Sequence, residues 1–261
     1  MPVANNLQGC RVLVTRPVAQ ARSLCERITR DGGVAIQLPT LAIEAIQDEI
    51  SQKFCQSAVD YDWLIFISRN AVEHGHACLP DPLPASLKIA AIGKATATIL
   101  SESGVYVDLE AGGVGTSESL LTELVLADMQ GQRVLIMRGE GGREVLAETL
   151  RERGAEVDYA NLYRRVRPPV VSGELSGLLD AGIDILTITS GETLDNLLAI
   201  AAEEQRDITH LPLVVMSERL LALARERGFT DTVIIATETS DEGVAEAIRH
   251  WCKDGHNGVS A

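Results

Sequence analysis

The chain carries the stretch Arg11-Val12-Leu13-Val14-Thr15-Arg16, and 122 residues later it carries Arg133-Val134-Leu135-Ile136-Met137-Arg138. Short apolar runs rich in β-branched residues are typical of buried parallel strands. An amphipathic stretch of helical length follows each run, so both copies begin a unit of one strand and one helix. The repeated stretch therefore predicts an α/β fold that is built from two related halves.

The offset of 122 residues holds well beyond this first strand. Residues 62–68 align with residues 184–190 at the same offset, and Gly104 aligns with Gly228 after a slip of two residues. Alternating strands and helices explain single coincidences but not a nearly constant offset, so we predict an internal duplication. The alternation also predicts two five-stranded sheets, with strands at 12–14, 35–38, 63–67, 88–92, 105–109, 133–137, 157–162, 185–189, 213–216 and 233–236.

Composition and charge exclude several classes of protein. The 261 residues are 46% hydrophobic and 23% charged, as in ordinary globular proteins, and the net charge of -14 disfavours nucleic acid or an anionic membrane as a partner. Five cysteines without any Cys-x-x-Cys pair argue against a disulfide framework or structural zinc, and no apolar run is long enough for a membrane helix. We therefore predict a cytoplasmic protein.

Hydroxyl side chains follow matching strands in the two halves. Ser68-Arg69-Asn70 opens one predicted helix, and Ser190-Gly191-Glu192 opens another. Open α/β sheets bind ligands at the carboxyl ends of their strands, so both serines are candidate ligand contacts. The alternative interpretation is that each serine only caps its helix.

A glycine-rich stretch, residues 139–144, also joins a predicted strand to a helix. Arg138 and Arg143 lie beside it, and this context suits an anion. The stretch does not fit the dinucleotide pattern G-x-G-x-x-G, because Glu144 stands where the third glycine belongs and its carboxylate would repel a pyrophosphate. The close pair His74 and His76 lacks a third metal ligand at a suitable spacing, so we interpret it as a surface turn.

Tyr163 lies in the basic stretch 161–169, which ends in Pro168 and Pro169 and indicates a connection between two lobes. A phenol keeps its proton at neutral pH and can donate it to a leaving oxygen. Alternatively, Tyr163 is an aromatic side chain that packs at this junction.

Several of these segments, in their order and spacing, resemble the uroporphyrinogen-III synthase family. The similarity extends from Val12 to about Ile248, and the segments that carry it are 12–17, 66–72, 91–97, 138–146, 162–165, 189–190 and 215–219. The resemblance implies two flavodoxin-like three-layer α/β lobes with parallel five-stranded sheets. It places residues 1–38 with 168–261 in one discontinuous lobe and 42–164 in the other. The two linker strands would lie near 38–44 and 160–167, and we expect the lobes to open and close about them.

The same resemblance implies a lyase without a metal or organic cofactor, which acts in haem biosynthesis. Its substrate is hydroxymethylbilane, an open chain of four pyrroles with eight carboxylates. Loss of the ring A hydroxyl group as water gives a cation, which ring D attacks at its substituted position to form a spiro intermediate. Fragmentation and reclosure then give uroporphyrinogen III with ring D inverted, whereas spontaneous closure gives the symmetric isomer. The enzyme is therefore expected to control the conformation of its substrate. We also expect a monomer that receives its substrate from porphobilinogen deaminase.

The resemblance further implies that Tyr163 assists loss of the hydroxyl group. Because a net charge of -14 repels an octacarboxylate, we expect binding by local backbone N–H groups at helix starts and by arginines at strand ends. The expected substrate contacts are Arg16, Ser68, Asn70, Gly93, Thr96, Arg138, Gly139, Arg143, Ser190, Ser217 and Arg219.

Two other classes of function stay open at this point. A two-lobed binding or sensor module could use the same repeat and arginines to close on a small anion, but it has no need of the Tyr163 segment. A nucleotide-dependent enzyme is disfavoured by the failed glycine pattern. Finally, the tail from Lys253 to Ala261 contains several Gly, Asn and Ser residues, and we expect it to lack order.

Overall fold

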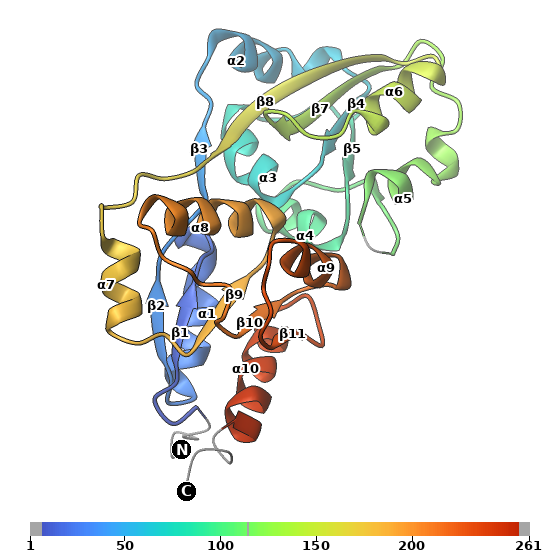
Figure 1. The fold of residues 1–261 in the computed structure, drawn as a ribbon. Helices are drawn as coiled ribbons and strands as arrows, with labels where there is room; N and C mark the ends of the chain where they lie inside the picture. Colours follow the sequence, from blue (N-terminus) through green and yellow to red (C-terminus); the bar gives the residue numbers. More distant parts are fainter. Residues whose placement is uncertain (1–6, 114, 256–261) are drawn as a thin grey trace, which may run out of the picture. The chain divides into compact units, whose positions relative to one another are not determined.

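A computed structural model describes residues 7–113 and 115–255 of the chain (Figure 1). The chain divides into two compact units, which we call unit 1 (residues 1–42 and 166–261) and unit 2 (residues 43–165). Both units are α/β structures with parallel strands, as the alternating sequence pattern predicts. None of the helices within the described ranges is long and apolar enough to cross a membrane.

The sheet of unit 1 contains five parallel strands in the order β11-β10-β9-β1-β2. These strands are β1 (Arg11–Val14), β2 (Val34–Gln37), β9 (Ile185–Ile188), β10 (Leu213–Val215) and β11 (Val233–Ile235). Val12 of β1 pairs with Ile185 of β9, so the sheet joins two parts of the chain that are far apart in sequence.

Helices cover both faces of this sheet because neighbouring side chains of a strand point to opposite faces. Val12 and Val14 pack into one core, whereas Leu13 packs into the other. The first core is covered by α1 (Val18–Arg30) and α10 (Asp241–Gly255), and the second by α7 (Glu174–Asp180), α8 (Gly191–Glu203) and α9 (Glu218–Glu226). Because α10 continues to Gly255, the first residues of the tail are helical; residues 256–261 lie outside the described part.

The sheet of unit 2 contains six strands in the order β3-β8-β7-β4-β5-β6, one more than predicted. They are β3 (Ala42–Ala45), β4 (Trp63–Phe66), β5 (Lys88–Ala91), β6 (Leu109–Glu110), β7 (Arg133–Gly139) and β8 (Glu156–Val166). The additional strand is β3, which overlaps the linker strand that the family resemblance implied near 38–44. It is only partly buried and therefore lacks the apolar run that reveals a strand in the sequence. The strand predicted at 105–109 is limited to the two residues of β6.

The cores of unit 2 also lie on both faces of its sheet. Phe66 and Met137 pack into a core with α2 (Glu49–Gln56), α3 (Arg69–Gly75) and α4 (Lys94–Glu102), whereas Ile65 and Ile136 pack with α5 (Ser117–Leu121) and α6 (Val145–Glu152). Three single turns of 3₁₀ helix complete the unit: η1 (Ala58–Asp60), η2 (His76–Cys78) and η3 (Leu124–Leu126).

The two sheets share one strand order under the 122-residue offset. The order β2-β1-β9-β10-β11 in unit 1 corresponds to β8-β7-β4-β5-β6 in unit 2. The register agrees as well. Val12 pairs with Ile185, and Val134 pairs with Trp63, so each partner is shifted by 122 residues, in opposite directions along the chain. Equivalent residues of the repeat therefore occupy equivalent places in two different sheets.

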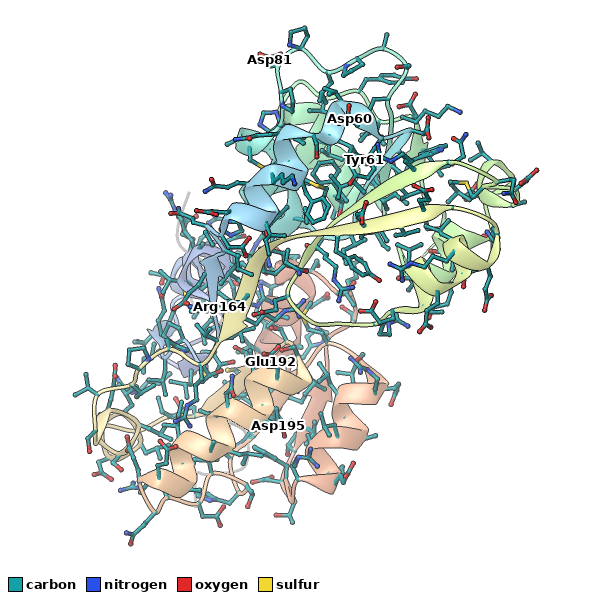
Figure 2. All side chains as sticks on the ribbon, turned by 90° about the horizontal axis from the view of Figure 1, so that it is seen from above. Asp60, Tyr61, Asp81, Arg164, Glu192 and Asp195 are labelled. Carbon is teal, nitrogen blue, oxygen red and sulfur yellow. A yellow bond between two sulfur atoms is a disulfide. The ribbon has the colours of Figure 1, made fainter. Side chains whose placement is uncertain are left out.

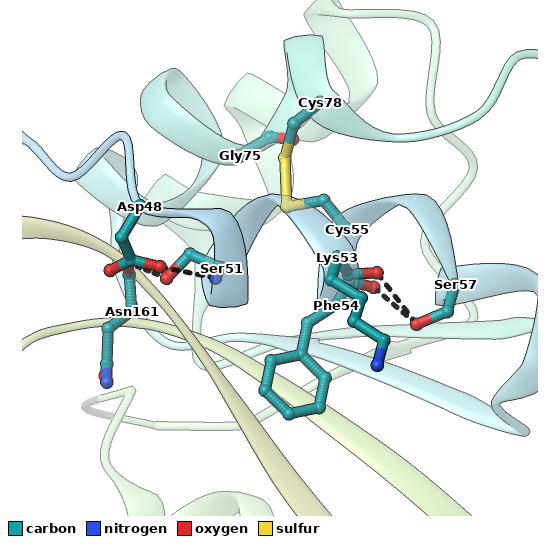
Figure 3. The surroundings of a disulfide bond; sticks show 9 residues. All are labelled: Asp48, Ser51, Lys53, Phe54, Cys55, Ser57, Gly75, Cys78 and Asn161. Carbon is teal, nitrogen blue, oxygen red and sulfur yellow. Dashed lines mark hydrogen bonds between the residues drawn. A yellow bond between two sulfur atoms is a disulfide. The ribbon is translucent and has the colours of Figure 1, made fainter.

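One pair of cysteines differs from the expectation of unpaired thiols. Cys55, near the end of α2, and Cys78, in η2, form a disulfide with 5.6 Å between their Cα atoms (Figure 3). The cysteines are 23 residues apart, and only the packing of α2 beside η2 brings them together. Cys10, Cys25 and Cys252 are free.

Candidate functional site

Four of the predicted site residues in unit 2 lie at one edge of its sheet. Ser68 follows β4, Gly93 follows β5, Gly139 ends β7, and Tyr163 lies near the end of β8. These strands run parallel, and Gly139 pairs with Tyr163. Their carboxyl ends therefore meet at the edge where open α/β sheets bind ligands.

Tyr163 is at the centre of this group. Its side chain is only 1% exposed, and its hydroxyl oxygen lies 2.9 Å from Oγ of Ser68. The ring lies against Gly139, where a Cβ atom would be 2.5 Å from a ring carbon, so only glycine leaves room for it. Tyr163 is thus packed in the core of unit 2, and its hydroxyl group is hydrogen-bonded to Ser68.

Ser68 performs the capping role that its sequence context allows. Its Oγ accepts a hydrogen bond of 3.0 Å from the N–H of Ala71, at the start of α3. Ser190 caps α8 in the same way, through Thr193, and Ser217 caps α9 through Leu220. The N-cap interpretation is therefore confirmed for Ser68 and Ser190. Ser68 differs from the other two because it also contacts a phenol.

Two more of the predicted substrate contacts, Gly93 and Thr96, lie at the start of α4. A Cβ atom on Gly93 would lie 2.8 Å from the Cα atom of Gly115, so the two backbones approach each other too closely for a side chain at position 93. Thr96 is buried, and its N–H donates a hydrogen bond of 3.0 Å to the carbonyl of Gly93. Asn70, in the first turn of α3, is half-buried.

The glycine-rich loop after β7 is held together by Arg138. This side chain is 4% exposed, and it donates to the carbonyls of Gly139 and Gly141 and to Glu144. Gly141 and Gly142 have φ angles of 72° and 101°, a region that favours glycine. The prediction of Arg138 as a free carboxylate ligand therefore needs correction, because its guanidinium group is occupied by its own loop.

The charges around this loop affect one another. The hydroxyl group of Tyr159 donates a hydrogen bond to Glu144, and together with Arg138 it holds the pKa of Glu144 below its ordinary value. The guanidinium group of Arg138 also lies 4.5 Å from the centre of the Tyr159 ring. In contrast, Arg143 is exposed and forms an ion pair with Glu118. Arg143 is therefore the arginine of this loop that a ligand can reach.

The predicted residues of unit 1 lie at the carboxyl edge of its own sheet. Arg16 follows β1, Ser190 follows β9 and Ser217 follows β10, and these three strands are neighbours. Arg16 is 8% exposed and forms an ion pair with Asp241, the first residue of α10. Like Arg138, it is committed to the protein, although no described atom accepts a hydrogen bond from its buried Nε. Arg219, in the first turn of α9, is exposed.

Two neighbours of Tyr163 were missed by sequence reasoning. The ring of His74 lies 5.8 Å from the ring of Tyr163, centre to centre, and the guanidinium group of Arg165 lies 5.9 Å from it. His74 belongs to α3, so its interpretation as part of a surface turn was wrong. His74 and Tyr163 meet only because α3 packs on the face of the sheet to which Tyr163 points. No local signal in the sequence predicts this contact.

Arg164, the next residue along β8, is labelled in Figure 2. It is exposed and donates two hydrogen bonds of 3.0 Å to Glu44 of β3. Tyr163 and Arg164 thus point to opposite faces of the strand, as the alternation of a strand requires. This alternation places the phenol in the core of unit 2 and leaves the guanidinium group of Arg164 in solvent.

Two surface hollows among the described residues do not involve the predicted site. One hollow of about 890 Å³ lies along α1 and β2, between Arg22, Cys25 and Gln37. Another of about 640 Å³ lies beside residues 79–85 and Tyr106. None of the predicted site residues lines either hollow. Within the described ranges, no three His, Cys, Asp or Glu side chains are grouped so that they could hold a metal ion.

The chain is similar to proteins of one family over most of its length. A family model described as uroporphyrinogen-III synthase HemD matches residues 22–245. The uroporphyrinogen-III synthase of Escherichia coli is 31% identical over 246 residues, which cover 91% of this chain and 99% of that protein. The uroporphyrinogen-III synthase of Salmonella typhimurium is 30% identical with the same coverage.

Solved structures agree with this similarity at the level of the fold. A mutant uroporphyrinogen III synthase from Thermus thermophilus superposes with a TM-score of 0.64 and 16% identity, covering 95% of this chain and all of that one. Uroporphyrinogen-III synthetase from Helicobacter pylori gives a TM-score of 0.58 and 15% identity, covering 96% of this chain and all of that one. These likenesses support the α/β architecture with parallel strands.

Proposed function

The chain belongs to the uroporphyrinogen-III synthase family, and we propose that its Tyr163 supplies the proton that releases water from the substrate. The reaction is the cyclisation of hydroxymethylbilane to uroporphyrinogen III in tetrapyrrole biosynthesis, and the enzyme is a cyclising hydro-lyase. The observation that supports the role of Tyr163 is its hydroxyl group, which lies 2.9 Å from Ser68 at the carboxyl edge of the unit 2 sheet.

In the first proposed step, the phenol of Tyr163 gives its proton to the hydroxyl group on ring A. The C–O bond breaks, water leaves with the bonding electrons, and ring A becomes a cation. Ring D attacks this cation at its substituted position, and the spiro intermediate then fragments and recloses with ring D inverted. The last step releases one proton from a pyrrole carbon, and this proton restores the phenol. Positioned proton donors of this kind typically contribute about 10²- to 10⁴-fold to a rate.

We propose that the carboxylates of the substrate bind mainly to backbone N–H groups. The first N–H groups of a helix lack partners within the helix and attract anions. In unit 2 these are the groups near Ser68 with Asn70 at the start of α3 and those that follow Gly93 at the start of α4; in unit 1 they are the groups near Ser190 and Ser217. Their place at carboxyl ends of parallel strands supports this assignment.

The four arginines divide into two roles in this proposal. Arg143 and Arg219 are exposed and contact carboxylates directly. Arg16 and Arg138 are buried. Arg138 holds the loop after β7 in the shape that presents its N–H groups, and Arg16 ties the residues after β1 to the start of α10 through Asp241. This division explains how a protein with a net charge of -14 binds an octacarboxylate through local groups.

We also propose that the protein works in the cytoplasm as a monomer and receives its substrate from porphobilinogen deaminase. Direct handover would protect the substrate, because free hydroxymethylbilane closes spontaneously to the symmetric isomer. The high negative charge supports a role without nucleic acid.

The activity is tested by a coupled assay in which porphobilinogen deaminase generates hydroxymethylbilane in the presence of the protein. After oxidation, the porphyrin isomers are separated by chromatography, and we expect the type III isomer to predominate. Formation of the type I isomer at the rate of a protein-free control would contradict the activity. A binding module for small anions would then be tested by direct titration with the ligand.

The role of Tyr163 is tested by Tyr163→Phe in the same assay. We expect the turnover number to fall at least about tenfold, because the variant keeps the ring but loses the proton. The matched control is Tyr106→Phe, a tyrosine of unit 2 that is 80% exposed, and its turnover should match that of the unmodified protein. Unchanged turnover of Tyr163→Phe would remove this residue from the mechanism.

A further inference from the structure

The hydroxyl group of Tyr163 has a defined environment inside unit 2. The side chain is 1% exposed, Gly139 faces one side of its ring, and the ring of His74 lies 5.8 Å away. The ring therefore has little freedom to turn. What stays adjustable is the direction of the O–H bond, which rotates about the bond between oxygen and ring. That direction depends on the hydrogen-bond partner, which is Oγ of Ser68 at 2.9 Å.

A count of donors and acceptors shows what Ser68 can do. A serine hydroxyl group has one proton to donate and two lone pairs that accept. One lone pair of Ser68 accepts from the N–H of Ala71 at 3.0 Å. Its proton is free to be donated to the oxygen of Tyr163. The phenol has one proton of its own, and if this proton pointed to Ser68 it could not be delivered to a substrate.

We propose that Ser68 is a positioning residue that donates its proton to the oxygen of Tyr163. This direction keeps the proton of the phenol available for the hydroxyl group of the substrate. It also provides a hydrogen bond to the negative charge that develops on the phenol oxygen, and hydrogen bonds to charged groups are stronger than those between neutral groups. The inference rests on the proposed function, in which Tyr163 is the proton donor.

The other capping serines show that this contact is more than a by-product of capping. Ser190 and Ser217 begin their helices with the same kind of side-chain hydrogen bond to a backbone N–H. The hydroxyl group of Ser190 makes its further contact with Thr193 inside its own capping box. Capping alone therefore needs no phenol, and the contact between Ser68 and Tyr163 is a separate feature of unit 2.

The test separates loss of the hydroxyl group from loss of the cap. Glycine at an N-cap position costs only a few tenths of a kcal/mol, so Ser68→Gly removes the donor and largely keeps the helix start. We expect the kcat of Ser68→Gly in the coupled assay to fall about tenfold, with KM within about twofold of the unmodified protein. Ser68→Thr keeps both the cap and the donor, and it should restore kcat to within about twofold.

The control is Ser240→Gly, which changes the serine that caps the start of α10 through the N–H of Gly243. This serine lies outside the proposed site, and kcat should not change. Melting temperatures and circular dichroism of all variants verify that they fold.

A double-mutant comparison shows whether Ser68 acts through Tyr163. In a Tyr163→Phe background the phenol oxygen is absent, so Ser68→Gly should cause no further loss of kcat. An equal loss in both backgrounds would overturn the inference, as would a Ser68→Gly variant with unchanged kcat. If Tyr163→Phe itself keeps full turnover, the proposed function of Tyr163 fails, which is a separate and distinguishable result.

Discussion

At the scale of single residues, the space that Tyr163 occupies is the space that a side chain at position 139 would need. Gly139 ends β7 and pairs with Tyr163 of β8, and the absence of a Cβ atom leaves room for the Tyr163 ring against the backbone. The glycine was selected in sequence reasoning as part of an anion-binding loop. The structure shows a second, steric reason for glycine at position 139, which is the space that the Tyr163 ring needs.

We therefore predict that Gly139→Ala displaces the ring of Tyr163. The new methyl group would lie 2.5 Å from a ring carbon, and relieving such a clash in a packed core typically costs about 1–3 kcal/mol of the free energy of unfolding. Turnover should fall as well, because the phenol loses its position beside Ser68. Thermal unfolding and the coupled assay measure the two effects.

Gly177→Ala is the matched control for this change. Gly177 lies in α7, and a Cβ atom there would meet nothing within 4 Å. Alanine in a helix should leave turnover unchanged and raise stability by up to about 1 kcal/mol. If Gly139→Ala were as stable and as active as this control, the close contact between Gly139 and Tyr163 would matter neither for stability nor for turnover.

The repeat-related residues Arg16 and Arg138 also share an arrangement at this scale. Both are buried near the carboxyl end of the first strand of their repeat. Each binds a carboxylate: Arg138 binds Glu144 of its own loop, whereas Arg16 binds Asp241 of α10. Arginine suits this position because its several N–H donors bind a carboxylate and other acceptors at once. We interpret them as supports of the two strand-end loops.

At the scale of elements, the helices that follow the parallel strands begin at a common edge of each sheet. Ser68, Ser190 and Ser217 cap α3, α8 and α9 directly after β4, β9 and β10. This arrangement collects unpaired N–H groups along the carboxyl edge of each unit. The anion-binding capacity that we propose is therefore a property of the element pattern as well as of individual side chains.

The disulfide between Cys55 and Cys78 links elements that support Tyr163 (Figure 3). Cys78 lies in η2, directly after α3, and Ser51 of α2 donates a hydrogen bond of 2.8 Å to the carbonyl of Asn161 on β8. Thus α2 contacts β8 near Tyr163, and η2 continues α3, whose His74 lies beside the ring of Tyr163. A covalent link between them restricts the unfolded chain over a loop of 23 residues.

We predict that reduction of this disulfide lowers the free energy of unfolding by up to about 3 kcal/mol, as expected for a loop of this length. The Cys55→Ser, Cys78→Ser double variant should show the same loss, and a reductant should have no further effect on it. Denaturant unfolding with and without dithiothreitol measures this difference. Cys25→Ser, at a free and half-buried cysteine, should respond to the reductant as the unmodified protein does. Equal stability with and without reductant would contradict the prediction.

At the scale of the whole molecule, the two units repeat one plan with exchanged parts. The strand order β2-β1-β9-β10-β11 corresponds to β8-β7-β4-β5-β6, and the registers of the central strands agree. We propose that the chain arose by duplication and that the first strands of the two copies are exchanged. The matched orders support this proposal, because unrelated α/β sheets have no reason to share both order and offset.

This plan predicts different behaviour for fragments of the two units. Residues 42–166 contain all six strands and both cores of unit 2, so this fragment should fold alone and unfold cooperatively on heating. Residues 166–261 lack β1 and β2. They therefore lack Leu13 of one core of unit 1, and Val12 and Val14 of the other core. This fragment should show no cooperative transition in circular dichroism. A cooperative transition of residues 166–261 alone would contradict the plan.

Sequence reasoning was most successful where a signal is local. The apolar runs located nine of the strands closely, because a buried strand needs a short continuous run, but they placed β6 too early. They did not reveal β3, whose residues are only partly buried; only the family resemblance placed a strand near 38–44. The N-cap interpretation of Ser68 and Ser190 needed only the order of a few residues. The disulfide and the contact of His74 with Tyr163 were not predicted, since each depends on two elements that pack side by side.

By itself, the sequence determined the α/β class, the 122-residue repeat and, through family resemblance, the reaction. These properties follow from short sequence patterns, namely the period of apolar residues, the spacing of motifs and the residue types at strand ends. The tertiary structure alone decided that Arg16 and Arg138 are buried supports, and that Ser68 meets Tyr163 from 95 positions away. Such contacts arise from strand pairing and helix packing between segments that are distant in sequence. A local pattern of residues does not show which side chains this packing brings within hydrogen-bond distance.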